Sequence, residues 1–185
     1  MNKVILVSGK ANSGKDTTID IAIEILKNKG YKSCKMAFAK YLKDLCKDYM
    51  GWNGDKDENG RTMLQYIGTD IIRDKLNWQT FHANRVCEDI QIVEDQYDFI
   101  FICDARFANE LYYTKSVFLE KCTDLLVLRP NLESELSNSQ KNHKSENALG
   151  DYEHSNLIVN DGDIGDLKGK VEHFIRCKLE VDCGE

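Results

Sequence analysis

A glycine- and lysine-containing segment near the N-terminus has the pattern of a phosphate-binding loop. Residues 9–17 read GKANSGKDT, which matches Gly, four residues, Gly and Lys, with Asp16 where Ser or Thr is usual. The two glycines allow tight backbone geometry, so that successive N–H groups can point at phosphate oxygens. Lys15 can then reach the β- and γ-phosphates of ATP. The ATP-binding residues predicted from this loop are Gly9, Ala11, Asn12, Ser13, Gly14, Lys15, Asp16 and Thr17.

Two carboxylates are candidates for holding Mg²⁺. Asp16 takes the place of the usual hydroxyl in the loop, and Asp104 follows the strongly apolar run 98–103. Carboxylate oxygens bind Mg²⁺ directly or through water, and the end of a parallel strand opens into the crevice where α/β proteins bind ligands. Thr17 is the alternative ligand to Asp16. For Asp104 the alternative is a helix-capping role.

A kinase for a phosphorylated acceptor needs a second anion site, and four arginines are candidates for it. Arginine binds phosphate with two parallel hydrogen bonds. Arg73 follows the apolar, glycine-containing run 66–72, and Arg106 follows the second carboxylate, where it would point toward the transferring phosphoryl group. Arg61 and Arg85 are explained equally well as solvated surface residues.

These residues need a scaffold, which the hydrophobic pattern supplies. Apolar strands are predicted at 3–8, 33–38, 98–103, 125–129 and 157–160. Helices are predicted at 14–29, 39–50, 62–76, 79–95, 108–116 and 165–179. A polar, glycine-rich loop is expected at 51–61 and a polar excursion at 130–155. Apolar strands that alternate with helices predict an α/β fold of three layers, with a central, mostly five-stranded parallel sheet and helices on both faces.

Composition limits the classes of protein and of partner. A length of 185 residues suits one domain. The net charge of −6 argues against a protein that coats a nucleic acid polymer. No apolar run is long enough to span a membrane. The seven cysteines form no CxxC pair, so reduced thiols in the cytoplasm are expected.

Several motifs together resemble those of the bacteriophage deoxynucleoside monophosphate kinases, a branch of the P-loop nucleoside monophosphate kinases. The matching segments occur in family order and span residues 4–170. They are Ser8-Gly9 with Ser13-Gly14-Lys15-Asp16-Thr17-Thr18, Gln65-Tyr66-Ile67-Gly68-Thr69-Asp70, Asp104-Ala105-Arg106 with Asn109-Glu110, Leu128-Arg129-Pro130, His143 to Glu146, and Ile158-Val159-Asn160-Asp161-Gly162.

The resemblance implies that residues 1–185 form a single nucleotide kinase domain, with an acceptor-binding region at about 39–95 and a lid-like segment at about 130–155. It implies transfer of the γ-phosphoryl group from ATP to a deoxynucleoside monophosphate (dNMP), with Mg²⁺. The reaction would take place in the cytoplasm, which is that of the host cell if the protein is phage-encoded. The resemblance is also compatible with a homodimer. The implied acceptor-binding residues are Lys43, Gly68, Asp70, Arg73, Arg106, His143 and Glu146. Asn160 and Gly162 would lie near adenine, and the catalytic residues would be Lys15, Asp104, Arg106 and Arg129.

Three alternatives stay open at this point. Other small-molecule P-loop kinases, of the dephospho-coenzyme A or phosphomevalonate type, share the loop and differ in the acceptor. A nucleic-acid-stimulated ATPase is disfavoured by size and charge. A non-catalytic nucleotide-binding regulatory protein is disfavoured by the intact Lys15, Asp104 and Arg106. The chain is shorter than some family members between the second strand and residue 68, so base preference does not transfer from the family.

Overall fold

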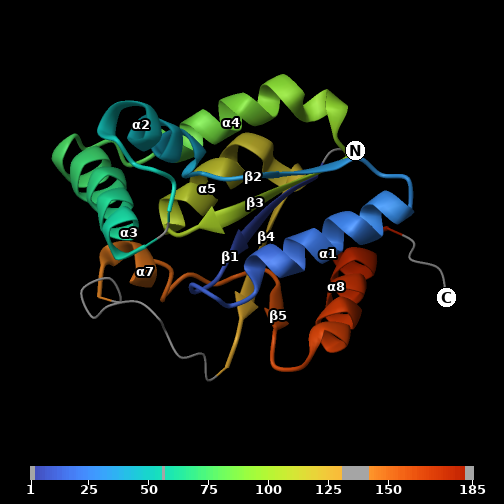
Figure 1. Cartoon of the computed structure of the whole chain (residues 1–185). Coiled ribbons are helices and arrows are strands. Elements are labelled where there is room, and N and C mark those ends of the chain that lie inside the picture. Colours follow the sequence, from blue (N-terminus) through green and yellow to red (C-terminus); the bar gives the residue numbers. More distant parts are fainter. Residues whose placement is uncertain (1–2, 56, 131–141, 182–185) are drawn as a thin grey trace.

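A five-stranded parallel sheet forms the centre of the protein (Figure 1). The computed structural model describes residues 3–55, 57–130 and 142–181. The strand order is β2-β3-β1-β4-β5. The strands are Lys3–Ser8 (β1), Ser33–Met36 (β2), Phe99–Ala105 (β3), Cys122–Leu128 (β4) and Leu157–Val159 (β5).

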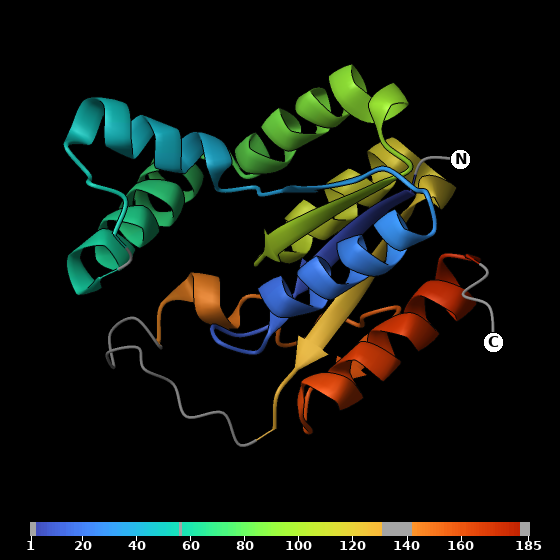
Figure 2. The ribbon, with the colours of Figure 1, turned by 45° about the vertical axis from the view of Figure 1, so that its right-hand side comes forward.

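Helices cover both faces of the sheet, which confirms the predicted three-layer α/β fold (Figure 2). Helices α1 and α8 lie on one face, and α4 and α5 lie on the other. The α-helices are Lys15–Asn28 (α1), Lys40–Met50 (α2), Glu58–Gln65 (α3), Phe81–Val93 (α4), Ala108–Phe118 (α5), Lys144–Asn147 (α7) and Ile164–Lys178 (α8). A π-helix spans Tyr66–Lys75 (η1), and short 3₁₀ turns span Glu94–Gln96 (η2) and Leu119–Lys121 (η3).

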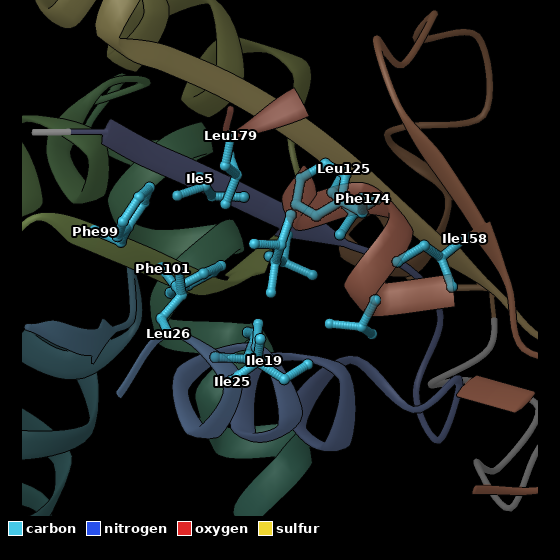
Figure 3. Packing of buried hydrophobic residues seen from close by; sticks show 14 of the residues in the cluster. Ile5, Ile19, Ile25, Leu26, Phe99, Phe101, Leu125, Ile158, Phe174 and Leu179 are labelled. Carbon is cyan, nitrogen blue, oxygen red and sulfur yellow. The ribbon is translucent and has the colours of Figure 1, made fainter. Parts of the chain in front are cut away.

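The core follows from the alternation of side chains along each strand. In β1, Val4 and Leu6 pack toward α4 and α5, while Ile5 and Val7 pack toward α1 and α8. Figure 3 shows the second of these layers, in which strand residues such as Phe101 face Ile19 and Leu26 of α1. Because both faces of the sheet are buried, the strands read as continuous apolar runs in the sequence.

The sheet order places the phosphate loop at the centre of the molecule. After β1 the chain crosses to one side to form β2 and β3, and later to the other side to form β4 and β5. Ligands of open α/β sheets bind at the carboxyl ends of the strands, where this order reverses. The loop 9–14 lies at that point, between β1 and α1.

Gly9 is required where the loop leaves β1. Its φ is +142°, and a Cβ atom there would overlap the Val127 carbonyl oxygen of β4. We expect Gly9→Ala to lower the free energy of unfolding by about 1–3 kcal/mol more than Gly30→Ala, measured by urea denaturation. Gly30 also has a positive φ, +85°, but a Cβ atom added to it would meet nothing within 4 Å. Equal losses in the two variants would show that backbone strain alone, without the overlap, sets the cost.

The segment predicted as the loop 51–61 folds differently at its end, because α3 begins at Glu58. Asn59 and Gly60 are poor helix formers, but the Asp57 side chain caps the helix by accepting from the Gly60 N–H at 2.7 Å. Gly60 is also needed for packing, since a Cβ atom would lie 2.6 Å from Trp52 Nε1. Close contact with the preceding turn therefore outweighs helix propensity here.

The helix predicted at 62–76 continues from α3 as the π-helix η1. The wider turn is seen in the bond from Leu76 N to Ile71 O, which spans five residues at 2.9 Å. A π-helix is rare, and it is found frequently at functional sites. Periodicity in the sequence predicts the helix but not this change of pitch.

The remaining predictions agree with the structure to within a few residues. Strand β4 begins at Cys122, three residues before its predicted start, and β2 ends at Met36, two residues before its predicted end. Of the expected excursion 130–155, residues 131–141 lie outside the described residues, and the rest contains α7. The six cysteines in the described part are free thiols. Among the described helices, none is long and apolar enough to cross a membrane.

Candidate active site

A cavity of about 430 Å³ lies at the carboxyl edge of the sheet, beside the ends of β1 and β3. That volume is in the range of small-molecule sites. The phosphate loop, α2, the continuous α3–η1 helix and α7 contribute to its walls. The cavity combines positive charge with apolar surface, which suits a phosphorylated ligand that carries a ring. Its basic residues are Lys15, Lys43, Arg61, Arg73 and Arg106, and its apolar residues include Phe38, Leu42, Leu64 and Phe107.

The phosphate loop presents Lys15 at one end of this cavity. Lys15 Nζ donates to the carbonyl oxygens of Gly9 at 2.8 Å and Lys10 at 2.7 Å. Burial, together with the charge of Arg106, lowers the pKa of Lys15. Asn12 and Gly14 both have positive φ, which gives the loop its tight curvature. The ammonium group thus rests on two backbone carbonyls, which phosphate oxygens can replace.

Asn160, expected near adenine, holds the phosphate loop in place. Its Nδ2 donates to the Ser13 carbonyl oxygen at 2.9 Å, and its own N–H donates to Leu128 O at 2.7 Å. A Cβ atom on Gly14 would overlap this amide group, so the glycine makes the contact possible. Gly162 lies close to Asp166 at the start of α8. The side chain of Asn160 is therefore already engaged with the loop backbone.

Asp104 makes capping contacts, but with a helix distant in the sequence. Its Oδ1 accepts from Phe38 N at 2.7 Å, and its Oδ2 accepts from Ala39 N at 3.1 Å. These N–H groups precede α2, whereas the capping alternative weighed from the sequence concerned the next helix, α5. Asp104 thereby ties the end of β3 to the start of α2, and it lines the cavity.

Arg73 is buried in an ion pair with Glu110 of α5, and its side chain is 3% exposed. Its guanidinium also donates to Gln79 O at 2.7 Å and lies 4.0 Å from the centre of the Phe107 ring. Glu110 accepts in addition from the backbone N–H groups of Arg106, at 2.8 Å, and Phe107, at 3.1 Å. Burial raises the pKa of Glu110 to about 7, against the lowering effect of the Arg73 charge. The pair fixes the turn that carries Arg106 and forms one wall of the cavity.

Helix α7 also reaches this cavity, through Ser145 and Glu146. Glu146 forms an ion pair with Arg106, and both residues line the cavity. Lys144 pairs with Asp74 at 2.6 Å, and His143 Nε2 lies 3.5 Å from Asp70. Charged contacts thus join α7 both to η1 and to the arginine that follows β3.

Comparison with known families decides among the P-loop kinases. A family model described as deoxynucleotide monophosphate kinase matches residues 50–171, which is more than half of the chain. The chain belongs to the deoxynucleotide monophosphate kinase family. It is therefore a phosphotransferase, and the leading prediction from the sequence is confirmed.

Solved structures of other P-loop kinases share the fold of this kinase. The APS kinase CysC of Mycobacterium tuberculosis, in complex with AMPPNP and APS, is 10% identical with a TM-score of 0.53, over 95% of this chain and 98% of that one. The dephospho-CoA kinase from Campylobacter jejuni is 13% identical with a TM-score of 0.50, over 95% and 96% of the two chains. At such identity the likeness concerns the fold alone. No curated protein matches the chain.

The cavity of this kinase brings together about half of the predicted site residues. Arg129 is exposed at the end of β4, outside the cavity lining. Asp70 and His143 contact one another beside the cavity, outside its lining, and Arg85 pairs with Glu88 on the surface of α4. The predicted residues that line the cavity are Ala11, Asn12, Lys15, Asp16, Lys43, Arg61, Gly68, Arg73, Asp104, Arg106 and Glu146.

Sequence reasoning missed much of the apolar and buried part of this site. Phe38, Leu42 and Phe107 were not singled out, because nothing in a single sequence separates cavity walls from core. His82 was also missed, since a lone histidine in an amphipathic helix has no distinctive spacing. Glu110 appeared only inside a family motif. Its position in the sequence, four residues after Arg106, could have suggested a role at the turn.

A larger hollow, of about 710 Å³, lies between β2, α2 and α4. It shares Lys43 and Cys103 with the cavity described above. Two of its lysines are paired with carboxylates, Lys35 with Asp16 and Lys40 with Asp44. Because it contains neither Lys15 nor Arg106, we place the active site in the smaller cavity.

Proposed function

We propose that the 430 Å³ cavity holds the phosphate of a dNMP next to the γ-phosphate of ATP, and that the phosphoryl group passes directly between them. One observation carries this proposal: Lys15 of the phosphate loop lines the same cavity as Arg61 and Arg106. A simple ATPase needs one anion site, whereas a kinase for a phosphorylated acceptor needs two that adjoin. The acceptor's own phosphate oxygen is the nucleophile, so a strong general base is not required.

Lys15 and Arg106 would neutralise the transferring group from two sides. Lys15 Nζ exchanges its contacts with the carbonyls of Gly9 and Lys10 for phosphate oxygens. Arg106 exchanges its partner Glu146 for a phosphate, which is possible because its side chain is 45% exposed. Guanidinium and ammonium groups placed in advance stabilise charge without reorganising at the moment of reaction.

The acceptor nucleoside would lie against α2 and η1. Leu42 and Gly68 form a close contact there, since a Cβ atom on Gly68 would lie 2.7 Å from Leu42 Cδ2. Gly68 therefore keeps the wall thin at this point, and Lys43 adds a positive charge beside it. Arg73 contributes by holding the wall, because its charge is already engaged by Glu110.

Asp16 is the residue that would hold Mg²⁺. Its carboxylate is exposed in the first turn of α1, and Lys35 Nζ already lies 2.7 Å from it, so the position accepts a cation. In the described residues no three His, Cys, Asp or Glu side chains gather as a metal site, but Mg²⁺ in phosphoryl transfer needs one or two carboxylates with substrate phosphates. Bound Mg²⁺ supplies neutralisation of the phosphate charge. Asp104 is the weaker ligand, because both of its oxygens accept backbone N–H groups.

Helix α7 would close the cavity, as the lid-like segment 130–155 was expected to do. Glu146 and Ser145 line the cavity, and the charged contacts of Lys144 and Glu146 can open without disturbing the core. Exclusion of water protects the phosphoryl group from hydrolysis. We place the reaction in the cytoplasm, which supplies ATP and dNMPs.

An assay of ADP release tests the proposal. ATP and Mg²⁺ are supplied with dAMP, dGMP, dCMP, dTMP or their ribo-forms one at a time, and products are separated by chromatography. We expect at least one deoxy-form to stimulate ADP release and to yield the matching dNDP. If no nucleotide stimulates release above the background without acceptor, the proposed acceptor is wrong, and dephospho-coenzyme A and phosphomevalonate are tested next.

A further inference from the structure

His82, in the first turn of α4, is a buried histidine in the wall of the cavity. It is 5% exposed and lines the cavity with Gly68 and Leu42. Its Nε2 lies 3.4 Å from the Gly68 carbonyl oxygen. A carbonyl oxygen can only accept, so Nε2 carries the proton in this contact. In the neutral ring Nδ1 is then a bare acceptor.

The surroundings keep this ring neutral. Burial and the positive charge of Arg73 lower the pKa of His82 to about 4, while the Gly68 carbonyl and Asp104 act in the opposite direction. Within the described part of the chain, His82 Nδ1 has no hydrogen-bond partner. A buried acceptor without a donor is unfavourable. A donor that enters the cavity would relieve that cost.

We propose that His82 Nδ1 accepts a hydrogen bond from an N–H group on the base of the acceptor nucleotide. The inference rests on the proposed function and adds a residue that selects for bases with a donor. The common bases all offer one, as the amino groups of adenine and cytosine and the ring N–H of guanine and thymine. The apolar residues Phe38, Leu42 and Leu64 line the same cavity and suit the faces of a base. Nδ1 is covered in this structure, so a base reaches it only if the ring or the side chains around it move as the base enters.

Nucleotides whose base lacks every N–H group provide the test. The best natural acceptor is compared with a donor-free analogue of the same ring size: the monophosphate of 2′-deoxynebularine for a purine, or of 2′-deoxyzebularine for a pyrimidine. We expect kcat/KM for the analogue to be about tenfold lower in the wild-type enzyme. This comparison needs no variant, so it stands even if His82 variants fold poorly.

Two substitutions separate the two nitrogens of the ring. His82→Asn places an oxygen near the position of Nδ1 and loses the contact to Gly68, whereas His82→Gln retains a donor near Nε2 and loses the acceptor. We compare kcat/KM for the natural acceptor with kcat/KM for the donor-free analogue. We expect His82→Asn to keep the wild-type ratio of these two values and His82→Gln to reduce that ratio to about one. KM for ATP should be unchanged in both variants. A purely structural role would slow both substrates equally in each variant.

The outcomes distinguish this inference from the proposed function. If the wild-type enzyme turns over a natural dNMP but treats the donor-free analogue equally well, the role of His82 is wrong and the proposed function stands. The inference also fails if His82→Gln keeps the wild-type ratio. If the enzyme turns over no dNMP at all, the proposed function fails first.

Discussion

Lys15→Ala lowers kcat by about 10²–10³-fold, and Arg106→Ala lowers it by about 10³-fold, in the assay of ADP release. Each substitution removes one of the two cavity-lining cations to which we assign neutralisation of the transferring group. The effect falls on kcat because the interactions strengthen as charge develops on the transferring group. Steady-state kinetics with saturating ATP and dNMP measure it.

Matched variants show that these losses are specific. Lys27→Ala removes an exposed lysine from the far end of α1 and should leave kcat unchanged. Thermal unfolding should change little in Lys15→Ala, because Lys15 Nζ contacts backbone carbonyls of its own loop. Near-normal turnover in either active-site variant would contradict the assigned roles.

Arg73→Met should lower the free energy of unfolding by about 3–5 kcal/mol, because it leaves the Glu110 carboxylate buried without its counter-charge. Urea denaturation measures the loss. The pH dependence gives a second readout. The folded-state pKa of Glu110 lies above its ordinary value of 4.5, and loss of the guanidinium raises it further. The folded variant then binds the proton more tightly than the unfolded chain, so its stability falls as pH rises above 4.5.

Two controls accompany this measurement. Arg85→Met breaks an exposed pair with Glu88 on α4, and it should cost less than about 1 kcal/mol. Adding Glu110→Gln to Arg73→Met should restore part of the stability, because the neutral amide oxygen can still accept from Arg106 N and Phe107 N. A loss in Arg73→Met no larger than in Arg85→Met would show that the buried pair does not support the wall.

Local signals in the sequence predict the scaffold well. The phosphate loop, the strands and most helices follow from glycine spacing and from apolar periodicity, which are properties of neighbouring residues. The start of α3 did not follow, because the contact between Gly60 and Trp52 depends on tertiary packing. The π-helix η1 did not follow either, since its residues have the same apolar pattern as an ordinary helix.

The partners of the site residues were harder to predict, because they are distant in the sequence. Asp104 binds backbone groups 65 and 66 residues away, and Arg73 finds Glu110 at a separation of 37 residues. From the sequence, Asp104 was predicted to hold Mg²⁺ and Arg73 to bind the acceptor. The structure shows that both already form bonds within the protein, where they shape the walls that ligands would contact.

The position of β1 has a consequence for how the enzyme is made. Its hydrogen-bonded neighbours are β3 and β4, which lie roughly a hundred residues later in the chain, and Asn160 holds the loop across a separation of 147 residues. During synthesis β1 leaves the ribosome before β3 and β4, so it has no partner strand until they follow. Pairing over such distances is slow. The nucleotide-binding loop, made before the strands that hold it, therefore becomes rigid among the last parts of this domain.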